Sequence, residues 1–250
     1  MAHPGSAAEA QVNFINASAQ LFGDLSYNGK AYILTDRKDT TYQSVFLPYF
    51  SRDNKFQYPS TAYNASLTQS WITYLNLAPG THQFILVDTS HYLRVKDNIN
   101  LKINAPVSIY YTDSLGYFKS FIFQDQLINE PANVRLRFLD FSPDAGNVFF
   151  TIDEKPASSR GFIKSLKYGG VTSFVSYPNP KTDTLRINFY QATDSTTIIA
   201  RTFLQAEPGH SYTLALTGYY SPFVSYPDPK NSNNYKNITG GLSVLVNTNN

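Results

Sequence analysis

The sequence predicts an all-β protein built from two tandem antiparallel β-sandwich domains. Three observations predict this fold. Two stretches of the chain repeat the same order of apolar positions, short segments alternate apolar and polar residues, and Gly, Pro and Asn turn signals separate these segments. Several short strands between regularly spaced turns are typical of a sandwich. The 250 residues suit two domains of about 120 residues each.

The repeat is clearest near the start of each half, where residues 11–18 match residues 135–142. A second match follows further along the chain at a shorter spacing, which predicts an insertion at about 31–79 of the first copy. The matched pairs are Val12/Leu136, Phe14/Phe138, Ile15/Leu139, Ile85/Ile187, Val87/Phe189, Pro106/Pro208, Tyr110/Tyr212 and Gly116/Gly218.

The chain then divides, in order, into a leader or flexible arm at 1–10, a first domain at 11–127, a linker at 128–133 and a second domain at 134–250. After the first strand we expect strands at 24–29, with Asn28-Gly29 as its hairpin turn, and at 148–153. Strict alternation predicts strands at 134–138 and 212–218, the latter ending on Gly218. The closing strands are expected at 117–123 and 242–246.

The order of these motifs resembles the bacterial domain of unknown function 4397 family. The second copy has the strand 134–138 leading into Ser142-Pro143-Asp144-Ala145, and later a Pro208-Gly209 turn before a strand that ends at Gly218. The first copy is more divergent and keeps the Asn28-Gly29 turn and Ala78-Pro79-Gly80. The resemblance implies an immunoglobulin-like sandwich of the kind found in envelope lipoproteins, and it implies no catalytic residues.

Composition excludes several functional classes. With a net charge of +2 and no Lys/Arg run, the chain lacks the basic surface that nucleic-acid binding requires. It has no Cys, so thiolate metal sites and Cys nucleophiles are absent. The four His do not form a metal-binding spacing, and no Gly-x-Ser-x-Gly occurs. We therefore expect no enzyme activity, no catalytic or metal-binding residues and no cofactor.

The low charged share of 15%, against about 25% in typical proteins, together with many Tyr, Asn and Thr, favours an exported protein. Residues 1–10 contain no apolar core of a signal peptide. We expect a location in the cell envelope or on the outer-membrane surface of a bacterium, with a lipid anchor in the natural precursor as the sole contact with the membrane.

Two groups of aromatic residues are the candidate binding residues. The first group lies in the expected insertion, where exposed Tyr and Trp would offer a large contact area at low entropic cost. The alternative is that these rings form a small satellite core under a long loop. The candidate residues of the first group are Tyr49, Phe50, Phe56, Tyr58, Tyr63 and Trp71.

The second group comes from an octapeptide that occurs twice almost unchanged, at 174–181 and 223–230, with Asn179 in the first copy and Asp228 in the second. Each copy contains Pro-Asx-Pro, which cannot lie within a central strand, so each is expected to end a strand in a stiff turn. If the turns lie side by side, Tyr177 and Tyr226 would form a paired contact surface with Lys181 and Lys230 at its rim. The alternative is that the chain uses the same turn chemistry twice.

These features favour a non-catalytic binding or assembly module. The main hypothesis is contact with a protein partner of an envelope complex through the aromatic and Pro-rich loops, which predicts one contiguous exposed apolar patch. The alternative is a carbohydrate-binding module of a glycan-uptake system, which predicts exposed rings beside Asn, Asp or Arg.

Overall fold

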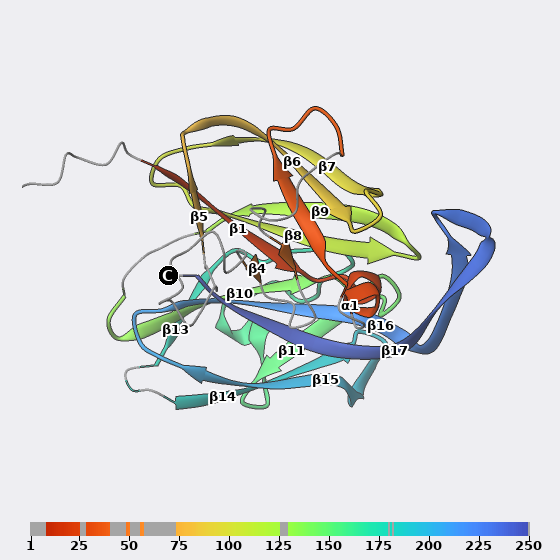
Figure 1. Ribbon diagram of the computed structural model, residues 1–250. Helices are drawn as coiled ribbons and strands as arrows, with labels where there is room; N and C mark the ends of the chain where they lie inside the picture. The colour runs from red at the N-terminus through yellow and green to blue at the C-terminus, as the bar shows by residue number, and fades with distance from the viewer. Residues whose placement is uncertain are drawn as a thin grey trace, which may run out of the picture. The chain divides into compact units, whose positions relative to one another are not determined.

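The computed structural model describes residues 9–25, 29–40, 49–50, 56–57, 74–125, 130–179, 181 and 183–249, with the side chains of 56–57 excepted. Nearly all regular structure in these residues is β, and it forms four sheets (Figure 1). The chain divides into unit 1, residues 1–125 and 227–236, and unit 2, residues 126–226 and 237–250. Each unit holds two sheets around its own core, so the predicted all-β sandwich class is confirmed.

Unit 1 contains a four-stranded sheet of order β5-β1-β8-β9 and a five-stranded sheet of order β4-β3-β2-β6-β7. The strands are β1 (Ala10–Asn16), β2 (Ala31–Thr35), β3 (Tyr49–Phe50), β4 (Phe56–Gln57), β5 (Leu75–Leu77), β6 (Gly80–Asp88), β7 (Leu93–Leu101), β8 (Val107–Ser114) and β9 (Tyr117–Gln124).

Unit 2 contains two four-stranded sheets, of order β13-β10-β16-β17 and β12-β11-β14-β15. The strands are β10 (Asn133–Asp140), β11 (Val148–Ile152), β12 (Lys155–Pro156), β13 (Val175–Pro178), β14 (Asp183–Gln191), β15 (Asp194–Ala206), β16 (Ser211–Asp228) and β17 (Asn231–Asn249). A short 3-10 helix, η3 (Ala157–Arg160), follows β12.

The two units share one pairing scheme. In each, the first strand pairs antiparallel with a short edge strand on one side and parallel with a long strand on the other, as β1 does with β5 and β8, and β10 with β13 and β16. In the facing sheet, β2 and β6 of unit 1 correspond to β11 and β14 of unit 2. The parallel pair in each unit departs from the purely antiparallel sandwich that was expected.

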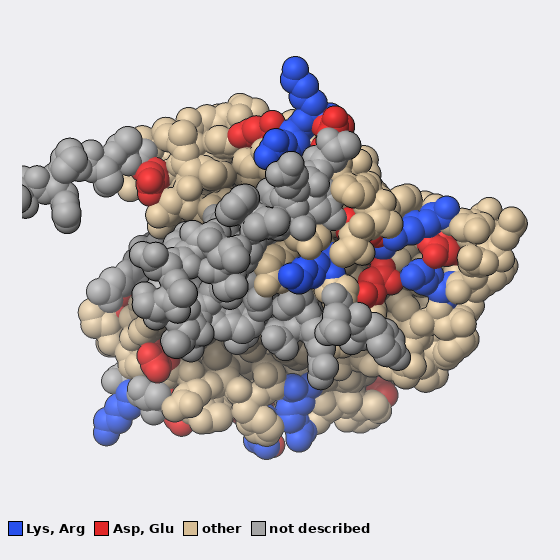
Figure 2. Space-filling model, viewed as in Figure 1, with Lys and Arg blue, Asp and Glu red and all other residues tan. Residues whose placement is uncertain are grey.

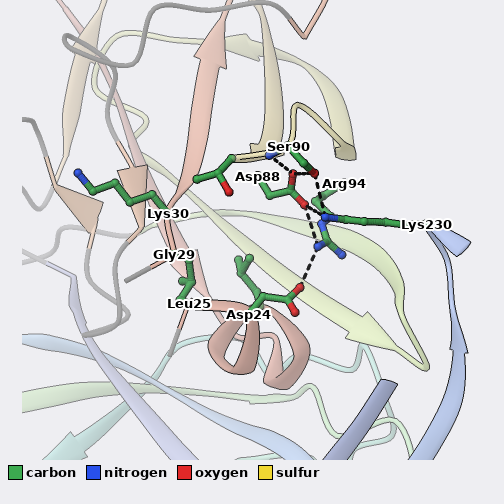
Figure 3. Close-up of a pocket in the computed structure, with 10 residues that line it drawn as sticks. Asp24, Leu25, Gly29, Lys30, Asp88, Ser90, Arg94 and Lys230 are labelled. Atoms are coloured by element: carbon green, nitrogen blue, oxygen red, sulfur yellow. Dashed lines mark hydrogen bonds and ion pairs between the residues drawn. The ribbon is translucent and has the colours of Figure 1, made fainter. Parts of the chain in front are cut away.

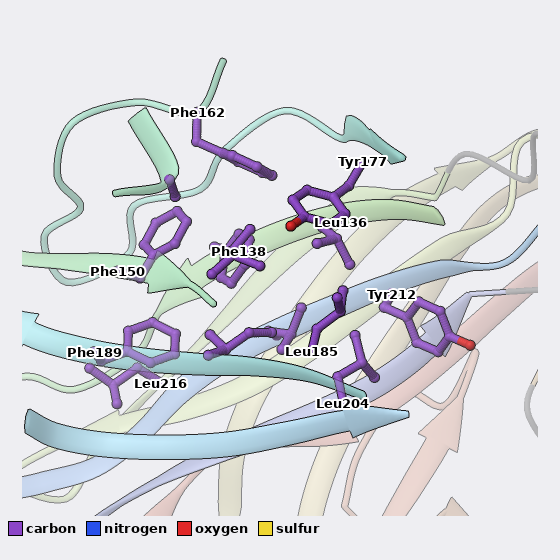
Figure 4. Packing of buried hydrophobic residues seen from close by; sticks show 14 of the residues in the cluster. Leu136, Phe138, Phe150, Phe162, Tyr177, Leu185, Phe189, Leu204, Tyr212 and Leu216 are labelled. Carbon is purple, nitrogen blue, oxygen red and sulfur yellow. The ribbon is translucent and has the colours of Figure 1, made fainter. Parts of the chain in front are cut away.

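Alternation of apolar residues builds both cores. In unit 2, Phe138 on β10 stacks on Phe150 of β11, with ring centroids 3.9 Å apart, and meets Phe162 and Phe189 edge-on (Figure 4). In unit 1, Phe14 holds the corresponding place on β1 and contacts Phe84 at 5.1 Å. The two sheets of each unit thus meet through side chains at alternate positions of facing strands.

The second strand of unit 1 lies later in the chain than predicted. Residues 19–25 form a short helix, α1 (Ala19–Leu25), because Leu21 and Leu25 are one helical turn apart and both are buried in the core. The central strand β2 follows at Ala31–Thr35, inside the segment expected to be an insertion. The prediction of a strand at 24–29 was therefore wrong, and residues 26–28 lie outside the described part.

Gly218 does not end its strand as predicted. β16 continues through it to Asp228, and β17 returns from Asn231, so the two strands form a long hairpin. Gly218 has a φ of 92° and lies so close to the carbonyl of Gly241 that a Cβ would collide with it, which only glycine tolerates. Residues 227–236, at the end of this hairpin, group with unit 1 rather than with the second domain expected at 134–250.

The ends of the predicted segments shift by small amounts. β1 begins at Ala10, which is buried, so the expected leader of 1–10 includes the first strand residue. β10 begins at Asn133, the last residue of the expected linker. In the part of the chain that the structure describes, no helix is long and apolar enough to span a membrane.

Candidate functional site

The predicted binding residues are mostly buried where the structure describes them. Tyr177 and Tyr226 are 8% and 3% exposed, so the exposed pair expected from the repeated octapeptide does not form. Both octapeptides do end a strand, β13 at Pro178 and β16 at Asp228, but both tyrosines are buried, Tyr177 in the core of unit 2. Phe50 is fully buried in the core of unit 1. The side chain of Phe56 and residues Tyr58, Tyr63 and Trp71 lie outside the described residues.

Tyr49 belongs to a small apolar group on the side of the five-stranded sheet that faces away from the core. We call this group the satellite cluster; its members are Tyr32, Leu34, Ile85, Val87 and Tyr49. The first four are at most 6% exposed, and Tyr49 is half-buried with the ammonium of Lys30 4.3 Å from its ring. For Tyr49, the structure agrees with the satellite-core alternative rather than with an exposed contact residue.

The equivalent sheet face of unit 2 is different and forms the candidate site. On β14 the core takes alternate residues, including Ile187 and Phe189, so the residues between them point to the opposite face. Neighbouring strands bring further side chains to the same face through registered pairs. We call this set the platform; its members are Phe149, Thr151, Arg186, Asn188, Tyr190, Arg201 and Phe203.

Three aromatic rings lie on the platform. Phe149 and Tyr190 are direct partners across β11 and β14, and their rings stack 5.0 Å apart at 11°. Each of these rings therefore covers one face of the other. Phe203 on β15 is not in that stack and is 62% exposed. It is the large apolar surface that the platform offers to a ligand.

Polar side chains separate the rings. Asn188 lies between Thr151 and Arg201 in the cross-strand row, and its carbonyl accepts a hydrogen bond of 2.7 Å from Nε of Arg201. Asn188 is only 2% exposed, whereas Arg201 is exposed. Arg186, paired across from Phe203, makes a 2.7 Å ion pair with Glu154. The platform thus combines an exposed ring with guanidinium and amide groups.

A second candidate is a pocket of about 180 Å³ in unit 1, between α1, the end of β6 and the end of the β16–β17 hairpin. Figure 3 shows the carboxylates of Asp24 and Asp88 directed at the guanidinium of Arg94, which binds them at 2.8 and 3.0 Å. Lys230 from the hairpin pairs with Asp88 as well. In Figure 2, acidic and basic side chains lie interspersed in this region, and much of the other described surface on that face is uncharged.

The charged groups in this pocket are engaged with one another. Burial alone would raise the pKa of Asp88, but hydrogen bonds from Lys230 and Ser90 and the charges of Arg94 and Lys230 hold that pKa well below its usual range. Lys236, on the same hairpin, forms a further ion pair with Asp24, with 2.9 Å between Nζ and Oδ1. The network fixes the end of the hairpin within unit 1, which is a structural role.

Each of the described histidines has a hydrogen-bond partner within the protein. Nδ1 of His82 pairs with Asp36 at 2.8 Å, and hydrogen bonds and the charge of Asp36 raise the pKa of His82 against the lowering effect of burial. His91 and His210 contact backbone carbonyls through Nδ1. Within the described residues, no three His, Asp or Glu side chains gather in a group that could hold a metal ion.

Sequence reasoning overlooked the platform although its signal was present. The segment Leu185-Arg186-Ile187-Asn188-Phe189-Tyr190 alternates core and outward residues. The predicted binding residues are aromatic residues expected in loops, whereas Phe149, Tyr190 and Phe203 lie within strands. The sequence alone does not distinguish an aromatic residue on the outer face of a strand from one that belongs to the core.

No family model matches this chain, and no curated protein matches it. Among solved structures, the chain is similar to one from work on alpha-glucan recognition by family 41 carbohydrate-binding modules from streptococcal virulence factors. That similarity covers 84% of this chain and 94% of the other, at 10% identity and a TM-score of 0.27.

Proposed function

We propose that the protein is a non-catalytic binding module whose platform in unit 2 binds carbohydrate. The observation that carries the proposal is the exposed ring of Phe203 beside a guanidinium that a buried amide holds in place. Binding sites for small ligands combine apolar surface with a few fixed polar groups that set orientation. The platform has both, on the strands of a sheet rather than on loops.

A sugar ring matches this arrangement of groups. Its C–H faces are weakly positive and pack on the negative face of an aromatic ring, which Phe203 offers. Its hydroxyls need donors and acceptors at the edge of that ring, and Arg201, Arg186 and Asn188 supply them. Apolar and polar side chains alternate over the platform, which fits a sugar better than the contiguous apolar patch expected for a protein partner.

Titration calorimetry with a panel of soluble oligosaccharides tests this proposal. We expect at least one glycan to bind, and Phe203→Ala to weaken it about tenfold or more, because one stacked ring contributes on the order of 1–2 kcal/mol. Phe223→Ala is the matched control, since Phe223 is 61% exposed but lies on β16, outside the platform. Absence of binding to every glycan at millimolar concentration would remove this function.

A protein partner is the second candidate, and one observation favours a different contact from the predicted loops. β17 is the last strand of its sheet, and its residues 237–249 contain no charge and no Pro, the usual protection of an edge strand. Leu242 and Val244 are only partly buried at the rim of the core, and Val246 is 39% exposed. A partner could add an extended strand there.

A photo-crosslinking residue at position 246, introduced in the producing cells, tests this contact. A single discrete protein adduct at 246, absent when the same residue is placed at the exposed Thr197 of β15, would support a partner strand on β17. The same adducts at both positions, or none at 246, would exclude it.

We also infer that the protein is exported to a bacterial envelope, lipid-anchored in its natural precursor, as the resemblance to the domain of unknown function 4397 family implies. The low share of charged residues and the many Tyr, Asn and Thr in this chain support that location. Cell fractionation and protease treatment of intact cells test it. Recovery of the natural protein in the cytosolic fraction would overturn it.

A further inference from the structure

Arg201 differs from the other charged side chain of the platform in how it is held. Its Nε donates to the carbonyl of Asn188 at 2.7 Å, and the amide nitrogen of Asn188 donates to the hydroxyl of Thr151 at 3.5 Å. Asn188 and Thr151 are both buried, so the amide cannot turn away without losing partners. The guanidinium is therefore fixed at its base before any ligand arrives.

The charge of Arg201 is not neutralised locally. Neither of its terminal amino groups has a hydrogen-bond partner among the described residues, and no described carboxylate forms an ion pair with it. Arg186 on the same face is paired with Glu154 instead. With Nε engaged, Arg201 keeps its two terminal amino groups for a ligand, and this pair of donors matches the two oxygens of a carboxylate.

The spacing from this charge to the exposed ring is that of one sugar unit. Arg201 and Phe203 are two residues apart on β15 and point to the same face, so their backbones are about 7 Å apart. A hexuronate ring lying on Phe203 can direct the carboxylate on its C5 to Arg201 over this distance.

We propose that the platform binds an acidic sugar, a hexuronate, with Arg201 taking the carboxylate and Phe203 the ring. This inference rests on the proposed carbohydrate-binding function and adds the ligand class. It makes Arg201 the residue that separates acidic from neutral sugars, and Asn188 the positioning residue that holds it.

Calorimetry with matched ligands tests the inference. The probes are oligomers of glucuronate, galacturonate and mannuronate, each as the free acid and as its methyl ester, which keeps the ring and removes the charge. We expect the free acid of one series to bind about tenfold or more tightly than its ester, because a charge-assisted pair of hydrogen bonds is stronger than a neutral one. Raising the salt from low to high concentration should narrow this preference.

Arg201→Gln should reduce the affinity for the acid to that for the ester and leave the ester unchanged. Arg186→Gln is the matched control and should keep the preference, because Glu154 already neutralises Arg186. Asn188→Ala should lower the preference partially. Equal binding of acid and ester by the wild type, or a preference that survives Arg201→Gln, would overturn the inference.

The outcomes separate this inference from the function on which it rests. If acid and ester bind equally and Phe203→Ala abolishes both, carbohydrate binding stands and the acidic specificity fails. If no sugar of any charge binds, the carbohydrate function itself fails.

Discussion

The sheet of β2 and β6 in unit 1 and the sheet of β11 and β14 in unit 2 share one strand arrangement, but their outer faces carry different side chains. Asp36 and Asp153 fix the equivalence, since each follows the second strand with φ near 50° and donates its backbone N–H to the neighbouring long strand. Counting back from them, Tyr32 and Leu34 of unit 1 match Phe149 and Thr151 of unit 2. Their cross-strand partners are Val87 and Ile85 in unit 1, and Tyr190 and Asn188 in unit 2.

The two faces differ at the cross-strand row that contains Thr151, Asn188 and Arg201 in unit 2, which we call the polar row. Unit 1 places Leu34, Ile85 and the exposed Lys96 in this row and buries the first two in the satellite cluster, whereas unit 2 places Thr151, Asn188 and Arg201 there. An aliphatic pair has to be covered, while an amide that anchors a guanidinium can face a ligand. We therefore infer that the side chains on this face, rather than the strand arrangement, distinguish unit 2, with its proposed binding site, from unit 1.

Exchanging the residues of the polar row tests this comparison with the largest expected effect. Ile85→Asn puts an amide among the apolar side chains of the satellite cluster and removes a buried aliphatic chain, so we expect unit 1 to lose about 3–5 kcal/mol of stability. The reverse exchange, Asn188→Ile, should change the stability of unit 2 by less than about 1.5 kcal/mol, because it puts an apolar side chain at a buried position and Arg201, which loses its partner, is exposed to water.

Hydrogen exchange measured by mass spectrometry reads the two units separately, which matters because two units need not unfold in one step. Faster exchange in β2 and β6 for Ile85→Asn, with β11 and β14 unchanged in Asn188→Ile, is the expected result. Equal destabilisation of both units would show that the two faces are not different in kind.

The next position along the same strands sharpens the contrast in charge. Asp88 of unit 1 pairs with Ala31, as Gln191 of unit 2 pairs with Val148. Asp88→Gln copies the residue of unit 2 but leaves buried Arg94 with one carboxylate partner instead of two. We expect a loss of about 2–4 kcal/mol in unit 1 at pH 7, measured by urea unfolding followed through exchange in β6 and β7.

The pH dependence of this effect has a definite sign. The pKa of Asp88 is lowered in the folded chain, so its stabilising contribution is present above the pKa of the unfolded state, near 3.9, and falls as the pH drops through the folded value. The difference in the free energy of unfolding between the wild type and Asp88→Gln should therefore be largest at pH 7 and vanish in strong acid. A difference that grows in acid would contradict this assignment.

Unit 2 contains a carboxylate with the opposite behaviour. Burial raises the pKa of Asp140 to about 7 against the lowering effect of the Ser142 N–H bond, and its Oδ2 has no hydrogen-bond partner. Asn16 has the same place in unit 1 and accepts the same bond, from Ser18. Because the folded pKa lies above the unfolded one, unit 2 loses stability as the pH rises from about 4 to about 7.

Asp140→Asn should remove that loss and make unit 2 about 1–3 kcal/mol more stable at pH 8, with little change at pH 4. The reciprocal variant, Asn16→Asp, should introduce the same loss into unit 1. Thermal unfolding and exchange in β10 and β1, recorded from pH 4 to 8, measure both. A flat pH profile in the wild-type unit 2 would contradict the raised pKa.

The alternation of apolar residues along the strands was enough to predict the fold class. It did not predict the short segments between the strands. The pairs Val12/Leu136 and Phe14/Phe138 point into the two cores, because an apolar alternation fixes which side of a strand is buried. Helix α1 could not be predicted from its seven residues alone, because its core contacts through Leu21 and Leu25 depend on the sheets around them.

The residue pairs matched later in the two copies are displaced by an odd number of residues. Because neighbouring residues of a strand face opposite sides of the sheet, the two members of such a pair lie on opposite faces. Ile85 was paired with Ile187, but Ile187 is in the core of unit 2 and Ile85 is in the satellite cluster on the opposite face of its sheet. Tyr110 was paired with Tyr212, yet the residue of β8 that holds the place of Tyr212 is Val107, since both pair with the matching position of the first strand. Both sides of these strands are apolar in unit 1, so the sequence does not mark the buried face.

The smallest expected effect tests the anchor of the whole comparison. Asp36 and Asp153 each accept a 2.9 Å hydrogen bond from the backbone N–H of the residue opposite, Gln83 and Arg186, in addition to their own backbone bond. Both adopt a positive φ that Asp tolerates better than Ala does. Asp36→Ala and Asp153→Ala should each cost about 0.5–1.5 kcal/mol, because each removes the same backbone hydrogen bond and adds the same backbone strain. Each also removes one side-chain contact, with His82 in unit 1 and with Tyr177 in unit 2. Unfolding in urea, with exchange at Gln83 and Arg186 as the local readout, measures both.

Asp36→Ala should also lower the pKa of His82, since the charge and hydrogen bond of Asp36 raise it, and titration of the His82 ring by NMR detects this. A large cost in one unit and none in the other would mean that the two turns are not equivalent, and the residue-by-residue matching of the satellite cluster with the platform would have to be redrawn.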